Sequence, residues 1–99
     1  MPRYCVVFGI KDVADRYLPI GEFYLRGVDL EGAKSLFKKL TNSAEGNYVF
    51  RLCERYYDKH TQADINYQKS EYTIETDQAG FHDLLDQLVK LQEKILEDN

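Results

Sequence analysis

The 99-residue chain resembles itself when it is shifted by 48 positions, and this internal similarity constrains the fold more than any other feature. The segment 72–88 then aligns with the segment 24–40. Because the matches fall at one helix start and along one helix face, they predict an internal duplication with repeats at about 1–48 and 49–99. The identical pairs are Arg3/Arg51, Cys5/Cys53, Lys11/Lys59, Tyr24/Tyr72, Asp29/Asp77, Gly32/Gly80, Leu36/Leu84, Leu40/Leu88 and Glu45/Glu93.

Each copy contains two strand-like segments. Residues 3–10 and 48–57 are rich in β-branched and aromatic residues that alternate between two faces, which predicts one strand in each copy. Residues 22–28 and 65–76 are predicted as the second strands. Residues 11–21 are predicted as a loop, because a proline and a glycine interrupt them.

A helix follows the strands in each copy. Asp29 and Asp77 stand where an N-cap carboxylate can accept hydrogen bonds from free backbone N–H groups. Apolar residues then recur at helical spacing, which predicts helices over about 30–41 and 78–97. The resulting order, β-β-α-β-β-α, predicts an α+β fold in which the whole chain, 1–99, forms a single domain. We expect one four-stranded antiparallel sheet with both helices packed on one face, since neither unit could bury its apolar face alone.

The two copies disagree in their second strands. The apolar residues of 65–76 change parity, so we expect a bulge or a break at 68–71. Exact repetition requires Tyr24 and Tyr72 to point to the same face, whereas their neighbours place Tyr24 outward and Tyr72 inward. We therefore expect one of these two assignments to be wrong, and the symmetry to fail at 72–76.

Composition excludes several classes of protein. The net charge of -4, with acidic and basic residues interspersed, disfavours nucleic-acid binding that depends on neutralising phosphates. The sequence has no apolar run long enough to span a membrane, so a soluble protein is expected. Two cysteines without a secretion signal predict a reducing, cytoplasmic environment.

Candidate catalytic and metal-binding residues are few. Cys5 and Cys53 fall on equivalent strands and could bridge or share a metal if those strands were neighbours, although packing of two small residues is the favoured interpretation. His60, with Asp58 and Asp64, lies in a polar loop of no standard metal spacing, and His82 is expected in solvent. We therefore predict no enzyme, no metal and no cofactor.

The face of the sheet opposite the helices carries the residue types most enriched at protein interfaces. The predicted binding residues are Arg3, Tyr24, Arg26, Arg51, Arg55 and Tyr57. The leading hypothesis is a small regulatory or binding module that engages a protein partner, or a second copy as a homodimer, through this face. The alternatives are single-stranded nucleic-acid binding on the same face and a small-molecule site at the pseudo-two-fold axis. These residues are also typical of the solvent-exposed face of an antiparallel sheet, where tyrosine and arginine occur without a binding role.

Overall fold

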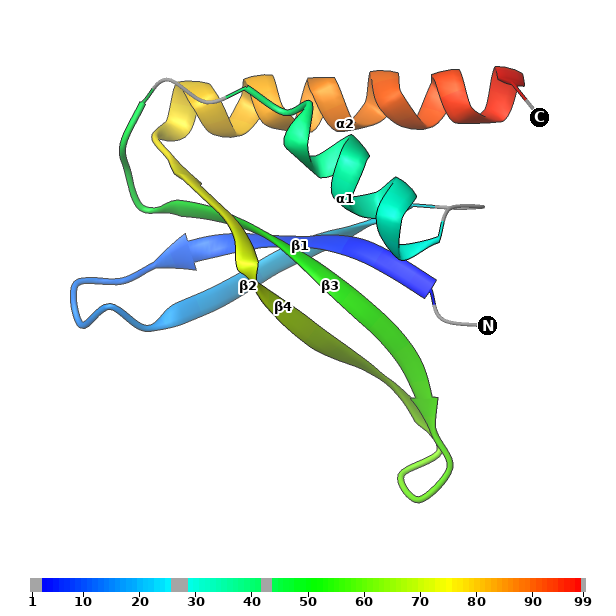
Figure 1. Ribbon diagram of the computed structural model, residues 1–99. Helices are drawn as coiled ribbons and strands as arrows, with labels where there is room; N and C mark the ends of the chain where they lie inside the picture. The colour runs from blue at the N-terminus through cyan, green and yellow to red at the C-terminus, as the bar shows by residue number, and fades with distance from the viewer. Residues whose placement is uncertain (1–2, 26–28, 42–43, 99) are drawn as a thin grey trace.

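The computed structural model describes residues 3–25, 29–41 and 44–98, without the side chains of residues 3, 56–57, 64–71 and 95–98. Four strands and two helices follow one another in the predicted order, β-β-α-β-β-α (Figure 1). The elements are β1 (Arg3–Lys11), β2 (Tyr17–Leu25), α1 (Leu30–Lys38), β3 (Tyr48–Asp58), β4 (Ala63–Thr76) and α2 (Gln78–Asp98).

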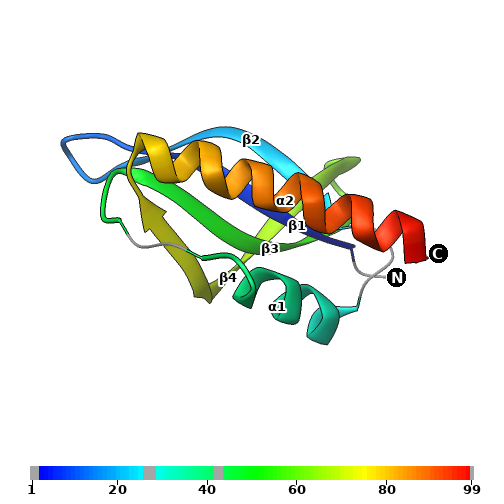
Figure 2. The same cartoon turned by 90° about the horizontal axis from the view of Figure 1, so that it is seen from above.

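The strands form one antiparallel sheet in the order β2-β1-β3-β4, which confirms the α+β class. Both helices lie on the same side of this sheet, α2 and α1 side by side above it in two perpendicular views (Figures 1 and 2). β1 and β3 are the central pair, and Cys5 is directly opposite Cys53. The sheet therefore has one face covered by helices and one face without them.

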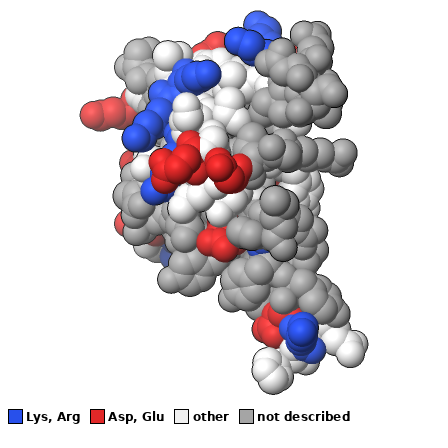
Figure 3. Space-filling model, turned by 45° about the vertical axis from the view of Figure 1, so that its right-hand side comes forward, with Lys and Arg blue, Asp and Glu red and all other residues white. Residues whose placement is uncertain are grey.

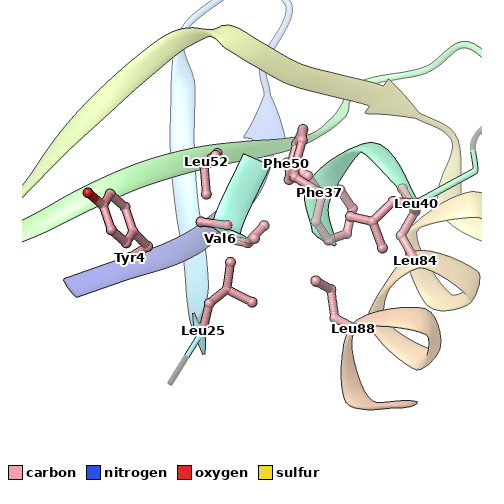
Figure 4. Close-up of a cluster of buried hydrophobic side chains, with 10 residues drawn as sticks. Tyr4, Val6, Leu25, Phe37, Leu40, Phe50, Leu52, Leu84 and Leu88 are labelled. Carbon is pink, nitrogen blue, oxygen red and sulfur yellow. The ribbon is translucent and has the colours of Figure 1, made fainter. Parts of the chain in front are cut away.

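The main hydrophobic core lies between the sheet and the helices (Figure 4). Successive side chains of a strand point to opposite faces of the sheet, and every second residue of β1 and β3 points toward the helices and into this core. The buried members labelled in Figure 4 are Tyr4, Val6, Leu25, Phe37, Leu40, Phe50, Leu52, Leu84 and Leu88. Residues from both helices and from β1, β2 and β3 therefore share one core.

Both helices begin at the predicted N-caps. One carboxylate oxygen of Asp29 accepts a hydrogen bond from the N–H of Gly32 at 2.8 Å, and Asp77 accepts from Gly80 at the same distance. Each bond satisfies a backbone donor that the first helical turn leaves without an intrahelical partner. The first helix ends at Lys38, three residues before the predicted end, and α2 extends to Asp98.

The predicted loop 11–21 and the predicted strand start at residue 22 are wrong, because β2 already begins at Tyr17. An edge strand tolerates Pro19 because one side of it needs no ladder hydrogen bonds, and the register shifts beside this residue, between Phe8 and Gly9 of β1.

A short turn replaces the predicted loop between β1 and β2. The carboxylate of Asp12 accepts from the N–H groups of Ala14 and Arg16, each at 2.9 Å. The last three residues of the predicted strand, 26–28, lie outside the described residues.

The predicted irregularity in β4 is confirmed. Arg51 pairs with Thr73 and Cys53 pairs with Gln68, so β4 advances five residues where β3 advances two. This irregularity resolves the conflict over the two tyrosines. Tyr24 is on the face without helices, whereas the ring of Tyr72 packs edge-on against Phe37 in the core, with centroids 6.3 Å apart. Both tyrosine assignments are therefore correct, and the expectation that one of them would be wrong is not borne out. The extra residues of β4 place Tyr72 on the face opposite to that of Tyr24.

Candidate functional site

The face of the sheet away from the helices, here called the open face, carries a second and smaller apolar cluster. Cys5, Val7 and Cys53 are its buried members, and the half-buried ring of Tyr17 packs against them. Cys5 is 0% exposed and Cys53 is 4% exposed, although neither helix lies above them. Other side chains of the sheet must therefore exclude water from the two thiols.

Two arginine–tyrosine pairs provide much of this cover. The guanidinium of Arg51 lies over the ring of Tyr17, 4.2 Å from its centroid, and that of Arg55 lies over the ring of Tyr24 at 5.0 Å. Both arginines belong to β3 and both tyrosines to β2, so each pair spans β1, the strand between them. We call these four residues, together with Glu22, the Arg–Tyr layer.

Glu22 links the parts of this layer. The Nη1 amino group of the Arg55 guanidinium donates to the Glu22 carboxylate and to the hydroxyl oxygen of Tyr24. The Tyr24 hydroxyl in turn donates to the same carboxylate at 3.0 Å. Charge-assisted hydrogen bonds and a cation–π contact thus fix the Arg55 side chain, which is 18% exposed, in one orientation.

A glycine allows the other pair to lie close to the sheet. A Cβ atom on Gly9 would lie 2.8 Å from the Tyr17 ring and would also overlap the carbonyl oxygen of Leu18. Only a residue without a side chain leaves room there for the tyrosine ring over the backbone of β1. The position of Tyr17, and with it the cation–π contact of Arg51, therefore depends on Gly9.

Burial sets the protonation of the two thiols. The pKa of Cys5 is raised from its ordinary value of 9.0 to about 12, chiefly by burial and also by negative charge at Cys53 and Glu22, while Arg55 lowers it. Burial also raises the pKa of Cys53, against the effect of Arg51. Neither cysteine is in a disulfide, and both are protonated near neutral pH, a state in which thiols are poor nucleophiles.

The charges on the molecule are mixed in sign. At the far side of the open face, Lys11 of β1 forms an ion pair with Glu75 of β4. On the side of the molecule shown in Figure 3, acidic and basic side chains lie next to one another rather than in separate fields. The described side chains on this side therefore form no extended positive surface of the kind that nucleic-acid backbones require.

Three of the predicted binding residues come together in this site: Tyr24, Arg51 and Arg55. The backbone of Arg3 lies opposite Arg55 in the β1–β3 ladder, but its side chain and that of Tyr57 are outside the described set. Arg26 lies outside the described residues altogether.

Tyr17 and Glu22 belong to the site but are not among the binding residues predicted from the sequence. Residues 11–21 were predicted as loop, which removed Tyr17, and Glu22 was not recognised as the acidic partner of an arginine on another strand. Strand alternation counted back from Tyr24 puts Glu22 on the same face of the sheet. The register shift beside Pro19 changes the alternation, so the same count does not give the face on which Tyr17 lies. A tyrosine ahead of a proline on an edge strand was the available signal.

The two histidines stand apart from the open-face site. His60 is exposed in the β3–β4 turn, where its backbone N–H donates to the Asp58 carboxylate at 2.8 Å. His82 is exposed on α2, with its ring 5.5 Å from the ring of Phe81. Within residues whose side chains are described, no three His, Cys, Asp or Glu residues form a group that could hold a metal ion. The side chain of Asp64 is not among them.

No helix in the described part of the chain is both long and apolar enough to cross a membrane. Comparison with protein-family models, with curated proteins and with solved structures found no match.

Proposed function

We propose that this chain is a small, non-enzymatic binding module with a regulatory role, and that its open face engages a protein partner. The observation that carries the proposal is the Arg–Tyr layer, in which two arginines of β3 stack on two tyrosines of β2. Arginine and tyrosine combine large contact area with directed hydrogen bonds, and they are enriched among the residues that dominate binding energy.

The layer is already ordered before any partner arrives. Arg55 is held by Glu22 and Tyr24, and Tyr17 lies closely over Gly9. Fixing such side chains in advance reduces the conformational entropy that binding must otherwise remove. Tyr24 also remains 41% exposed, so part of the layer is available to a partner surface. These features support a protein-binding surface that is preorganised in its closed arrangement.

A protein partner fits this face better than a nucleic acid. One face of each tyrosine ring carries a guanidinium group, and the charge of Arg55 is balanced by Glu22. Bases would need open ring faces for stacking, and phosphates would need cationic groups that are not already neutralised. The net charge of -4 also favours the protein partner.

The partner can be a second copy of this chain, since an open sheet face that is complementary to itself would give a two-fold dimer. We also propose the cytoplasm as the compartment, because the two buried thiols form no disulfide. The proposal includes an ancestral duplication of a ββα unit, supported by the identical residue pairs and by the placement of Cys5 opposite Cys53.

The test compares two variants of the layer with one variant elsewhere. Arg51→Glu reverses a charge over Tyr17, and Tyr24→Ala removes the exposed ring. Lys90→Glu on α2, which is also exposed, serves as the control. Light scattering after size exclusion gives the oligomeric state of each protein. Quantitative affinity capture from the source cells gives the bound proteins.

We expect either the dimer or a defined set of captured proteins to be lost in both layer variants and kept in the control. A wild-type chain that stays monomeric, and whose captured proteins ignore both layer variants, would overturn the proposal. Circular dichroism of each variant establishes that it is folded.

A further inference from the structure

Cys5 and Cys53 occupy a hydrogen-bonded position in the central β1–β3 ladder. Their register is unbroken from Arg3 opposite Arg55 to Ile10 opposite Tyr48. One residue farther along, the N–H of Lys11 donates to the carbonyl of Asn47 at 2.8 Å. Hydrogen-bonded and non-hydrogen-bonded pairs alternate in an antiparallel ladder, so the cysteine pair, six residues back, is hydrogen-bonded as well.

This position sets the distance between the two residues. Directly opposed residues in a hydrogen-bonded pair have Cα atoms about 5.5 Å apart, which lies in the range that disulfides adopt. Their Cβ atoms, at up to about 5.5 Å, must approach by roughly 1 Å to allow a sulfur–sulfur bond. A disulfide can therefore form with a small movement of the strands, and it would be strained and readily reduced.

The Arg–Tyr layer controls access to the pair. Both thiols lie on the face that Arg55 and Tyr24 cover, and Cys5 has no exposed surface. Burial keeps both thiols protonated, as their raised pKa values show, so the closed arrangement is unreactive. An oxidant can react only after the layer opens and water reaches a sulfur atom.

We propose that Cys5 and Cys53 are a redox modification site: they form a reversible disulfide across the two central strands when the Arg–Tyr layer opens. The oxidant is a low-molecular-weight disulfide of the glutathione type. Cytoplasmic disulfides, where they occur, are mostly transient and serve sensing or catalysis.

The chemistry proceeds by two thiol–disulfide exchanges. One cysteine loses its proton and attacks a sulfur of the small disulfide, which forms a mixed disulfide and releases one small thiolate. The second cysteine, deprotonated in turn, attacks the protein sulfur of that mixed disulfide and displaces the second small thiolate. The protein thereby gives up two electrons and two protons, and one small disulfide becomes two small thiols.

The experiment treats the reduced, full-length chain with oxidised glutathione, stops the reaction with acid and alkylates the remaining thiols. Intact mass then separates the reduced chain, the glutathione adduct and the internal disulfide. Peptide mapping identifies a linked pair that contains Cys5 and Cys53. We expect the internal disulfide to form without lasting adduct and to be reversed by dithiothreitol. Cys5→Ser should stop at the adduct on Cys53.

Three variants distinguish opening of the layer from unfolding of the whole chain. Tyr24→Ala should accelerate oxidation roughly fivefold, the shift that the loss of one cation–π pair makes in an opening equilibrium. Tyr24→Phe keeps the ring over the arginine and should change the rate little. Leu84→Ala weakens the core on the opposite face and should leave the rate near that of the wild type under native conditions.

The proposal is overturned if the wild-type chain accumulates the glutathione adduct without an internal link, or if it stays reduced until it unfolds. It is equally overturned if Leu84→Ala accelerates oxidation as much as Tyr24→Ala does. None of these results bears on partner capture, so this inference and the proposed function can fail separately.

Discussion

The two faces of the sheet exclude water by different means. On the helix-covered face, α1 and α2 bury apolar residues such as Phe50, Leu52 and Leu84 to 0% exposure. On the open face, Cys5 reaches the same exposure under side chains that belong to the sheet itself. The first cover is a layer of secondary structure, and the second is a set of long side chains that cross from β3 to β2.

The two faces therefore differ in their contribution to the stability of the fold and in how easily their side chains can rearrange. Burial of apolar area provides most of the folding free energy, so the covered face is expected to dominate stability. Cation–π pairs and partly exposed ion pairs each contribute much less, so the Arg–Tyr layer can open or rearrange at small cost. A surface of this kind can present contact residues, and can open, while the core stays folded.

The largest predicted effect is the loss of stability when a core side chain on the covered face is truncated. Leu84→Ala on the covered face should lower the free energy of unfolding by about 2–5 kcal/mol, because it leaves a cavity in the core. Tyr24→Ala on the open face should lower it by about 1 kcal/mol or less. Urea denaturation of both variants measures the difference. Equal losses would show that the two faces are not energetically distinct.

The next effect tests how closely the Arg–Tyr layer lies on the sheet. Gly9→Ala should destabilise the fold by about 1–3 kcal/mol, because its methyl group overlaps the backbone of β2 at Leu18 and contacts the Tyr17 ring. Gly21→Ala is the control on the covered face, where the added methyl meets the tip of a side chain, the Phe8 ring, rather than backbone. Thermal unfolding should rank Gly9→Ala as the more harmful change, and the reverse order would contradict the close approach of β2, with its Tyr17 ring, to Gly9.

Alkaline pH should weaken the fold through the open face. The native pKa of Cys5 is about 12 against an ordinary 9.0, so above pH 9 the unfolded chain has released a proton that the native chain retains. The stability that depends on the protonated Cys5 thiol is therefore fully present below pH 9 and is lost as pH rises toward 12. Tyr17 and Tyr24, whose pKa values are also raised, act in the same direction.

Melting temperatures measured from pH 8 to pH 11 test this decline. The double variant Cys5→Ala/Cys53→Ala should show a shallower decline than the wild type, because it removes the two thiols and keeps the two tyrosines. An unchanged slope in the double variant would show that the thiols are not the groups responsible.

The smallest effect is a gain on the covered side. Thr76 is 0% exposed, and its hydroxyl has no hydrogen-bond partner in the described part of the structure. Thr76→Val removes this buried polar group at nearly constant shape and should raise the free energy of unfolding by about 1 kcal/mol. Thr73→Val, at an exposed position, is the control and should give no gain. A loss at Thr76→Val would mean that the hydroxyl is bonded in solution.

Much of the architecture follows from local sequence signals. The two aspartate caps, the helical leucine spacing and the alternation in β1 and β3 are properties of neighbouring residues, and each led to a correct element. The change of parity in residues 65–76 also located the irregularity in β4. It did not give the number of extra residues, because that number depends on how β4 pairs with β3.

The site was less predictable because its contacts join distant strands. Alternation placed Tyr24, Arg51 and Arg55 on one face, but it contains no information on strand order. Only the order β2-β1-β3 brings each arginine over a tyrosine across an intervening strand. Pro19 also led residues 11–21 to be predicted as a loop, which removed Tyr17 from the predicted site.

Site-specific photo-crosslinking tests most directly whether the open face is the binding surface. A photoreactive phenylalanine analogue is placed at Tyr24 on the open face or at Val89 on α2, two positions that are 41% and 44% exposed. After illumination in the source cells, position 24 should give a discrete crosslinked protein, or a product of twice the mass of the chain. Position 89 should give none. Crosslinks from position 89 alone, or none from position 24, would contradict the open face as the site of partner binding.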